Sequence, residues 1–299
     1  ATGLTSGPYF FLIGTYDSTA VRTANFGQRP FSYTPPSGYK TLCTYNLPAS
    51  TILNGAKYMA ATTFNGVTGG GSVVNTVLNA SFQPDFVWMK CRNAARNHEL
   101  ADSVRGTPYA LFSNLTNAEV SDTRVSAFNS NGFSFGTNSN SAVTGDTEVA
   151  WQWKAGGTAV TNTAGSITSQ VSANTTAGFS VVTFTANGSA ATIGHGLGVA
   201  PSMIITKRRD AISGWPVYHI SDGNTGYLNL CTTGAFAVDS TVFNNTSPTS
   251  SVCPVGSVWP NAATIVYYCF AAIPGFSAFG SYQGNGSADG PFVYLSLIH

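Results

Sequence analysis

The sequence predicts an all-β protein made of tandem antiparallel β-sandwich units of the concanavalin or jelly-roll type. Short runs of β-branched and aromatic residues recur, each bounded by Gly, Pro, Asn or Ser. The 32 glycines and 14 prolines are closely spaced, as tight turns between short strands require. Good helix formers hardly occur in blocks, and only 117–124 predicts a short turn of helix. The clearest strands are expected at 86–90, 181–184, 203–206 and 264–268.

An internal repeat connects these strands. The segment 84–92 (PDFVWMKCR) aligns with 201–209 (PSMIITKRR) at an offset of 117 residues, and 149–153 aligns with 266–270 at the same offset. Two distant matches at one spacing predict a duplicated unit. The string YQGNG at 282–286 resembles FTANG at 184–188, which indicates that a third copy begins near the end.

The repeat predicts four segments along the chain. Residues 156–178 contain almost only small or polar residues with a few valines, so we expect a linker or extended connection there, with a domain boundary. The predicted division is 1–50, then a first sandwich at 51–160 and a second at 161–278, then a third repeat or a C-terminal strand at 279–299.

Composition excludes several classes of function. Charged residues make up 8% of the chain and the formal net charge is +1, so no strong electrostatic field is available to hold nucleic acid. Two stretches, 155–206 and 240–288, carry no charge at all. Both are rich in Gly, Ser, Thr and Asn, and neither has the roughly 18 apolar residues of a spanning helix, so no membrane insertion is expected. Five cysteines without a Cys-x-x-Cys pair predict neither a disulfide scaffold nor a zinc site.

The residues give little support for catalysis. Asp146 and Glu148 are spaced so that both could lie beside a sugar, as a glycosidase requires. The alternative is a turn aspartate and a solvated glutamate, and it is favoured because the repeat has Ala263 and Ile265 there. No histidine has metal-ligand spacing, and no Gly-x-Ser-x-Gly string is present. We therefore expect a protein without enzymatic activity, catalytic residues, metal or cofactor.

Sugar binding is the better supported chemistry. Aromatic faces pack under the C–H surfaces of sugars, and planar polar groups bind their hydroxyls. The variable middle of each unit offers such groups, with His98 beside those of the first unit. The candidate ligand-binding residues are Arg96, Asp102, Arg105, Trp215, Tyr218 and His219. The alternatives are core packing for the aromatic residues and a surface ion pair of little energetic value for Asp102 with Arg105.

Most of the chain resembles known viral sequences. The strings at 25–31 (NFGQRPF), 33–39 and 42–48 resemble the closing segment of SPRY-like, concanavalin-type sandwich domains from phage and viral structural genes. The repeats resemble a domain that often follows this string in marine phage proteins. Its marks are PDFVWMK at 84–90, DSVRG at 102–106, GDTEVAWQWK at 145–154 and GHGLGVAP at 194–201.

This resemblance implies a virion protein, assembled in the host cytoplasm and part of a tail fibre or other host-facing appendage. The expected partners are other virion proteins and a host-surface glycan or receptor. Strand edges without charged residues pair with other chains unless they are covered, so a homo-oligomer is expected, and a trimer because fibres are commonly trimeric. The alternatives are a capsid-decoration or fibre-shaft protein without a ligand, and a glycan-cleaving tailspike.

Overall fold

Strands dominate the computed structural model, which describes residues 50–77, 79–136 and 142–290 and six residues between 29 and 37. The polypeptide divides into two units, Ala1–Pro48 and Ala49–Leu297, and all the strands described belong to the second. Most residues of the expected SPRY-like strings lie outside the described residues. The prediction of an all-β fold with antiparallel sandwich units is confirmed.

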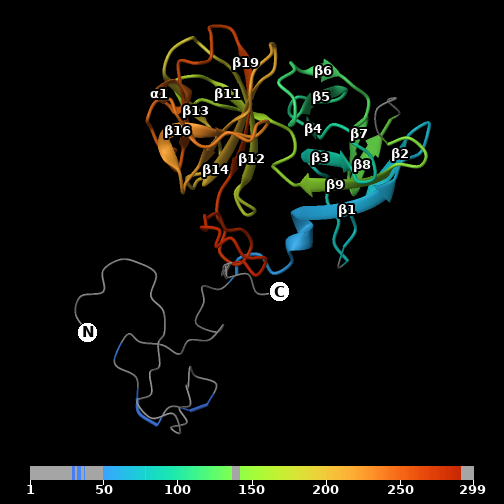
Figure 1. Ribbon diagram of the computed structural model, residues 1–299, viewed down its shortest axis with the longest axis horizontal. Coiled ribbons are helices and arrows are strands. Elements are labelled where there is room, and N and C mark those ends of the chain that lie inside the picture. The colour runs from blue at the N-terminus through green and yellow to red at the C-terminus, as the bar shows by residue number, and fades with distance from the viewer. Residues whose placement is uncertain are drawn as a thin grey trace. The chain divides into compact units, whose positions relative to one another are not determined.

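Two large antiparallel sheets form the centre of the second unit (Figure 1). The first large sheet has the order β1-β9-β3-β4-β5-β6, and the second has the order β10-β11-β12-β19-β14-β15-β16-β17. The first comprises β1 (Met59–Asn65), β3 (Phe86–Cys91), β4 (Glu99–Asp102), β5 (Tyr109–Phe112), β6 (Val120–Ser121) and β9 (Thr147–Trp153). The second comprises β10 (Val160–Asn162), β11 (Ser169–Asn174), β12 (Phe179–Thr185), β14 (Met203–Arg208), β15 (Pro216–His219), β16 (Gly223–Asn229), β17 (Ala237–Val238) and β19 (Thr264–Phe270).

Two smaller sheets complete the fold. One has the order β2-β8-β7, and the other pairs β13 with β18. Their strands are β2 (Gly71–Val74), β7 (Ala127–Asn129), β8 (Gly132–Phe135), β13 (Ala191–Gly194) and β18 (Val252–Val255). Helical structure among the described residues is limited to one 3-10 turn, η2 (Gly55–Lys57), and α1 (Ser240–Phe243). No helix in this part of the chain is long and apolar enough to cross a membrane.

The large sheets repeat one strand order. The order β1-β9-β3-β4-β5-β6 in the first sheet corresponds to β12-β19-β14-β15-β16-β17 in the second. The strands β3, β4 and β9 begin and end 117 residues before β14, β15 and β19, the same offset as in the sequence alignment. The two sheets are therefore copies of one topology, and β10 and β11 are an addition to the second copy.

Three hydrophobic cores separate four layers. Val87, Met89 and Phe133 belong to the core between the first large sheet and β2-β8-β7. The core that includes Ile193 and Tyr267 lies between the second large sheet and β13-β18. A third core, which we call the shared core, joins the facing surfaces of the two large sheets. Because strand side chains alternate between faces, β3 and β9 contribute to the shared core on one face and to the first core on the other.

Stacked rings dominate the shared core. The ring centroid of Phe86 lies 4.3 Å from that of Tyr268, 5.2 Å from that of Trp153 and 5.8 Å from that of Phe179. Offset stacking of this kind adds to the stabilisation from burial. The shared core thus joins the first repeat to the second through aromatic residues of both.

Three segments differ from the sequence-based expectations. Residues 156–178 contain strands β10 and β11 rather than a plain linker, because the valines among the polar residues pair in register, as Val171 does with Val182. The segment expected as a helical turn at 117–124 contains β6, whose Val120 pairs with Ala110 of β5. Residues 279–290 contain no strand, and the rest of the expected third repeat lies outside the described residues.

Candidate ligand-binding site

Three tryptophans lie together on the first large sheet. The alternation of β9 directs Trp151 and Trp153 to the face that carries the shared core, and Trp88 of β3 lies opposite Trp151 in register. The rings of Trp88 and Trp151 are 6.5 Å apart and nearly perpendicular, at 81°. All three side chains are only partly buried, so they present aromatic surface to solvent.

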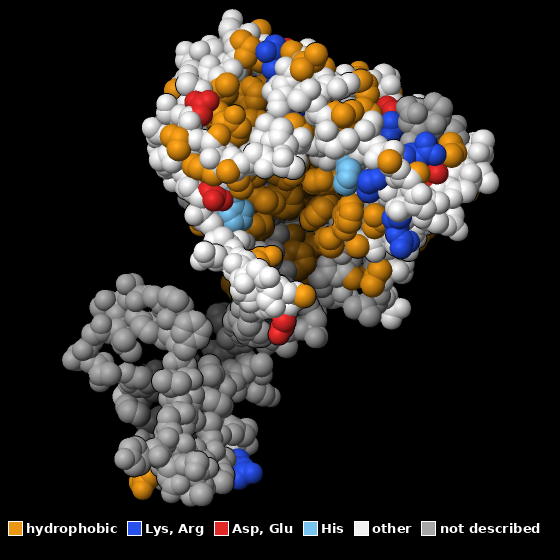
Figure 2. Space-filling view, in the orientation of Figure 1, with side chains coloured by type: hydrophobic (Ala, Val, Ile, Leu, Met, Phe, Trp, Pro, Cys, Tyr) orange, Lys and Arg blue, Asp and Glu red, His pale blue; other side chains and the backbone are white. Residues whose placement is uncertain are grey.

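These tryptophans surround a hollow. Trp88, Trp151, Trp153 and His98 line a cavity of about 320 Å³, which we call the tryptophan cleft. In Figure 2, apolar side chains gather in a hollow near the centre of the visible face, where Figure 1 shows β3 and β9 beside β12. The volume is at the lower end of the range typical of small-molecule sites. The cleft is therefore small, open and mainly aromatic.

The second repeat borders the cleft on the other side. The ring of Trp153 lies 6.0 Å from that of Phe270, which pairs with Met203 in register. Met203 and Phe279 are partly exposed and pack against the shared core. His219 pairs with Met203, and its ring lies 6.4 Å from that of Phe279. Side chains of both repeats thus contribute to this region.

Hydrogen bonds fix the polar edge of the cleft. The indole Nε1–H of Trp88 donates to Nδ1 of His98 over 3.2 Å, so the neutral imidazole carries its proton on Nε2. The backbone N–H of His98 donates to Oδ1 of Asn114, whose amide donates to Oδ1 of Asn97. Burial lowers the pKa of His98, and the positive charge of Lys90 adds to this effect. His98 is therefore neutral at pH 7 and held in one orientation.

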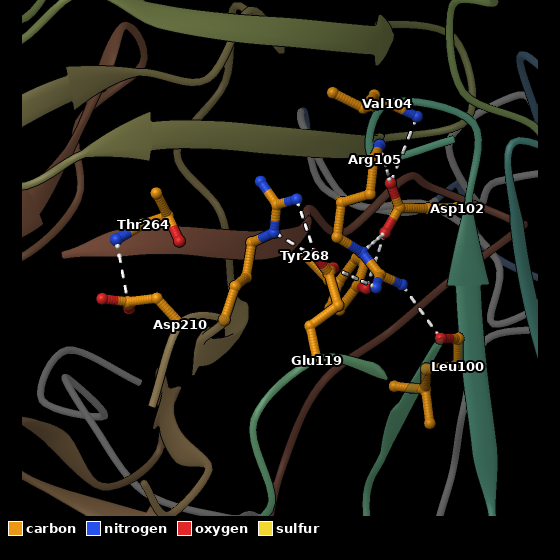
Figure 3. A network of polar contacts seen from close by, with 9 residues as sticks. Leu100, Asp102, Val104, Arg105, Glu119, Asp210, Thr264 and Tyr268 are labelled. Atoms are coloured by element: carbon orange, nitrogen blue, oxygen red, sulfur yellow. Dashed lines mark hydrogen bonds and ion pairs between the residues drawn. The ribbon is translucent and has the colours of Figure 1, made fainter. Parts of the chain in front are cut away.

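A buried ionic network joins the repeats elsewhere in the shared core (Figure 3). Arg105 donates to the carboxylate of Asp102, to Oε1 of Glu119 over 2.8 Å and to the carbonyl of Leu100 over 2.9 Å. The hydroxyl of Tyr268 donates to Oδ2 of Asp102 over 2.8 Å. Every one of these groups except the Glu119 carboxylate is buried.

Residues of both repeats balance the charge of this network. Arg209 of the second repeat binds Glu119 of the first through both carboxylate oxygens, at 3.1 and 2.8 Å. Burial by itself lowers the pKa of Arg105, but the negative charges of Asp102 and Glu119 outweigh it, and the pKa lies above its ordinary value. Arg105 is therefore charged, and its contacts hold the two repeats in one arrangement.

Four of the six predicted ligand-binding residues are interior. Asp102 and Arg105 belong to the ionic network rather than to a surface ion pair. The indole of Trp215 is buried and donates to the carbonyls of Phe112 and Leu115, and Tyr218 is buried beside Phe243. Such side chains are closed to a ligand in this structure, because their polar atoms and ring faces are occupied by the protein.

The other two candidates are partly exposed. His219 lies on β15, where it pairs with Met203, and its Nδ1 is 3.8 Å from Asp222. Arg96 binds Oδ1 of Asp146 over 3.0 Å, on the face of the first large sheet opposite the cleft. His219 is linked to Trp153 through Met203 and Phe270, and no candidate among the six is one of the residues that line the cleft. The sequence signal for the cleft is the pair Trp151 and Trp153, whose spacing puts both on one face of β9, and neither was among the six candidates.

The carboxylates Asp146 and Glu148 lie in a buried group of side chains that a ligand cannot reach. Among the described residues, one group of possible metal ligands is found, in which atoms of Cys91, Asp146 and Glu148 lie within 4.8 Å of one another. All three are buried, and the guanidinium of Arg96 binds Asp146 while the N–H of Ala142 donates to Glu148. Burial raises the pKa of Glu148, which is therefore not the solvated side chain expected. Glu148 and Trp151 point to opposite faces of β9, so these carboxylates do not reach a ligand in the cleft.

The fold and this site define a tandem β-sandwich protein with an aromatic cleft beside the shared core. The chain belongs to the family described as "Domain of unknown function (DUF7483)", whose model matches residues 54–297. No curated protein and no solved structure matches it.

Proposed function

We propose that this protein is a non-enzymatic virion protein, part of a tail fibre or other host-facing appendage, that binds a host-surface glycan in the tryptophan cleft. The virion setting is supported by the sequence resemblance at 25–48 and in the repeats. The proposal that the protein binds a glycan is supported above all by one observation. Three partly exposed tryptophans converge on a cavity of about 320 Å³.

The cleft combines the two kinds of group that sugars need. The tryptophan rings offer faces for the C–H surface of a pyranose, and His98, Asn97 and Asn114 place planar polar groups beside them. Packing against Phe86 and Phe270 holds the Trp153 ring, so little side-chain entropy is lost when a ligand binds. A rigid aromatic surface of this kind suits repeated, reversible contact with a glycan.

The mutation that tests this proposal is Trp151→Ala. We expect it to weaken binding of the recognised glycan at least tenfold, because a stacking partner worth about 1.4 kcal/mol or more is removed. Glycan-array binding followed by calorimetry on the intact protein measures the effect. The control is Tyr109→Ala, which removes an aromatic side chain that is 43% exposed on β5. Equal affinity of Trp151→Ala and wild type would count against the cleft as the binding site.

An uncharged edge strand of the first large sheet also favours a role in assembly with other chains. In the described part of the first large sheet, β1 is an edge strand of seven residues without a charged side chain, whereas the opposite edge β6 has two residues. Long uncharged edges are prone to pair with other chains. We therefore include a homo-oligomer, expected to be a trimer, in the proposal. Sedimentation equilibrium tests it, and a monomer at micromolar concentration would contradict it.

A further inference from the structure

We propose that the tryptophan cleft selects an uncharged pyranose residue, which accepts a hydrogen bond from the Nε2–H of His98. This inference rests on the proposed function, since it names the class of glycan for the same site. It follows from the charge of the cleft, from the tautomer of His98 and from the way Trp88 holds that tautomer.

The cleft offers no ionic partner to a ligand. Its lining consists of Trp88, Trp151, Trp153 and a neutral His98, with neither a carboxylate nor a guanidinium. The ammonium of Lys90 is not part of this lining, and two of its three N–H groups donate to the carbonyls of Cys91 over 2.7 Å and Ala94 over 3.3 Å.

An acidic sugar would therefore bring its carboxylate against apolar ring faces. A charge that loses water without gaining a partner is strongly disfavoured. The C–H face of an uncharged pyranose has no such cost and matches the tryptophan rings.

His98 supplies a directed donor. Its Nδ1 is the acceptor for Trp88 Nε1–H, so its Nε2 carries the proton and donates. No hydrogen bond from Nε2 to another described residue occupies this N–H, and His98 is one of the four residues that line the cavity. A hydroxyl or ring oxygen of the sugar is an acceptor of suitable size. The backbone contact of His98 with Asn114 fixes the position of this donor relative to the tryptophans.

Protonation of His98 would disturb the same geometry. A second proton on Nδ1 would face the Trp88 N–H across 3.2 Å, so two donors would oppose each other. Burial and the charge of Lys90 on β3 keep the pKa of His98 below its ordinary value, so the neutral form prevails at pH 7. Affinity is then constant above this pKa and falls as the pH decreases through it.

The first experiment compares sugars that differ only in charge. Methyl glucoside with methyl glucuronide, and methyl galactoside with methyl galacturonide, are titrated into the intact protein by calorimetry. We expect a neutral member to bind and its acidic partner to bind at least tenfold more weakly. An acidic partner that binds equally or more tightly would overturn this inference and leave glycan binding intact. If neither these sugars nor host polysaccharide bind, the proposed function fails as well.

The second experiment changes the donor. His98→Phe is expected to weaken binding of the neutral sugar about tenfold and to remove the loss of affinity that sets in as the pH falls below 6.5. His98→Gln keeps an N–H donor, so it should retain more affinity than His98→Phe and also lose the pH dependence. The control Tyr109→Ala, on β5 and outside the lining of the cleft, should keep the wild-type pH profile. A wild-type pH profile in both His98 variants would overturn the role assigned to His98.

Discussion

Replacing Arg105 by alanine is expected to lower the free energy of unfolding by about 3–5 kcal/mol, the cost typical of breaking a buried ionic network. In this variant Asp102 loses its ion-pair partner, and Glu119 keeps only its ion pair with Arg209. The Asp102 side chain is completely buried, and the Glu119 side chain is 11% exposed. Urea denaturation followed by circular dichroism measures the change.

The control for this prediction is Arg208→Ala. Arg208 forms a comparable ion pair with Asp210 at 2.9 Å, but both side chains are partly exposed. Exposed pairs contribute at most about 1 kcal/mol, so the control should be close to wild type. Equal stabilities of Arg105→Ala and Arg208→Ala would show that the network in Figure 3 does not hold the repeats together.

Phe86→Ala is expected to destabilise the protein by about 3–5 kcal/mol, as large-to-small changes of buried aromatic residues do. Phe86 is completely buried and stacks with Tyr268 and Phe179 of the second repeat and with Trp153 of the first. Its loss opens a cavity where the two large sheets meet. Thermal denaturation measures the effect, and Phe86→Leu should lose less because it leaves a smaller void.

The number of transitions in thermal denaturation also tests whether the shared core joins the two repeats. Since residues of both repeats surround Phe86, one cooperative transition should move to lower temperature in Phe86→Ala. Two transitions, of which only one moves, would contradict a core shared by both repeats.

The fold class and the repeat could be predicted because they depend on local patterns. Runs such as 86–90 and 264–268 show β-branched and aromatic enrichment between turn residues, and the structure places β3 and β19 there. The offset of 117 residues appears in the alignment and again in the bounds of β3 with β14 and β9 with β19. These features can be recognised in the sequence without knowing how the sheets pack.

The site could not be predicted as fully, because burial depends on tertiary packing. Trp215 and Trp151 are both aromatic residues beside polar segments, yet the structure buries Trp215 in the shared core and leaves Trp151 partly exposed. Asp102 and Arg105 have the spacing of a surface pair, but the second repeat covers them with Tyr268. Face-to-face packing of the two large sheets decides these outcomes, and no local pattern encodes it.

The most direct measurement is a sugar titration of the wild-type protein followed by nuclear magnetic resonance of the indole N–H groups. The chain has five tryptophans, so each reports separately. We expect a neutral glycoside to shift the signals of Trp88, Trp151 and Trp153 and to leave those of the buried Trp215 and Trp259 in place. If a sugar that binds shifts only Trp215 or Trp259, or none of the five, the tryptophan cleft is not the ligand-binding site.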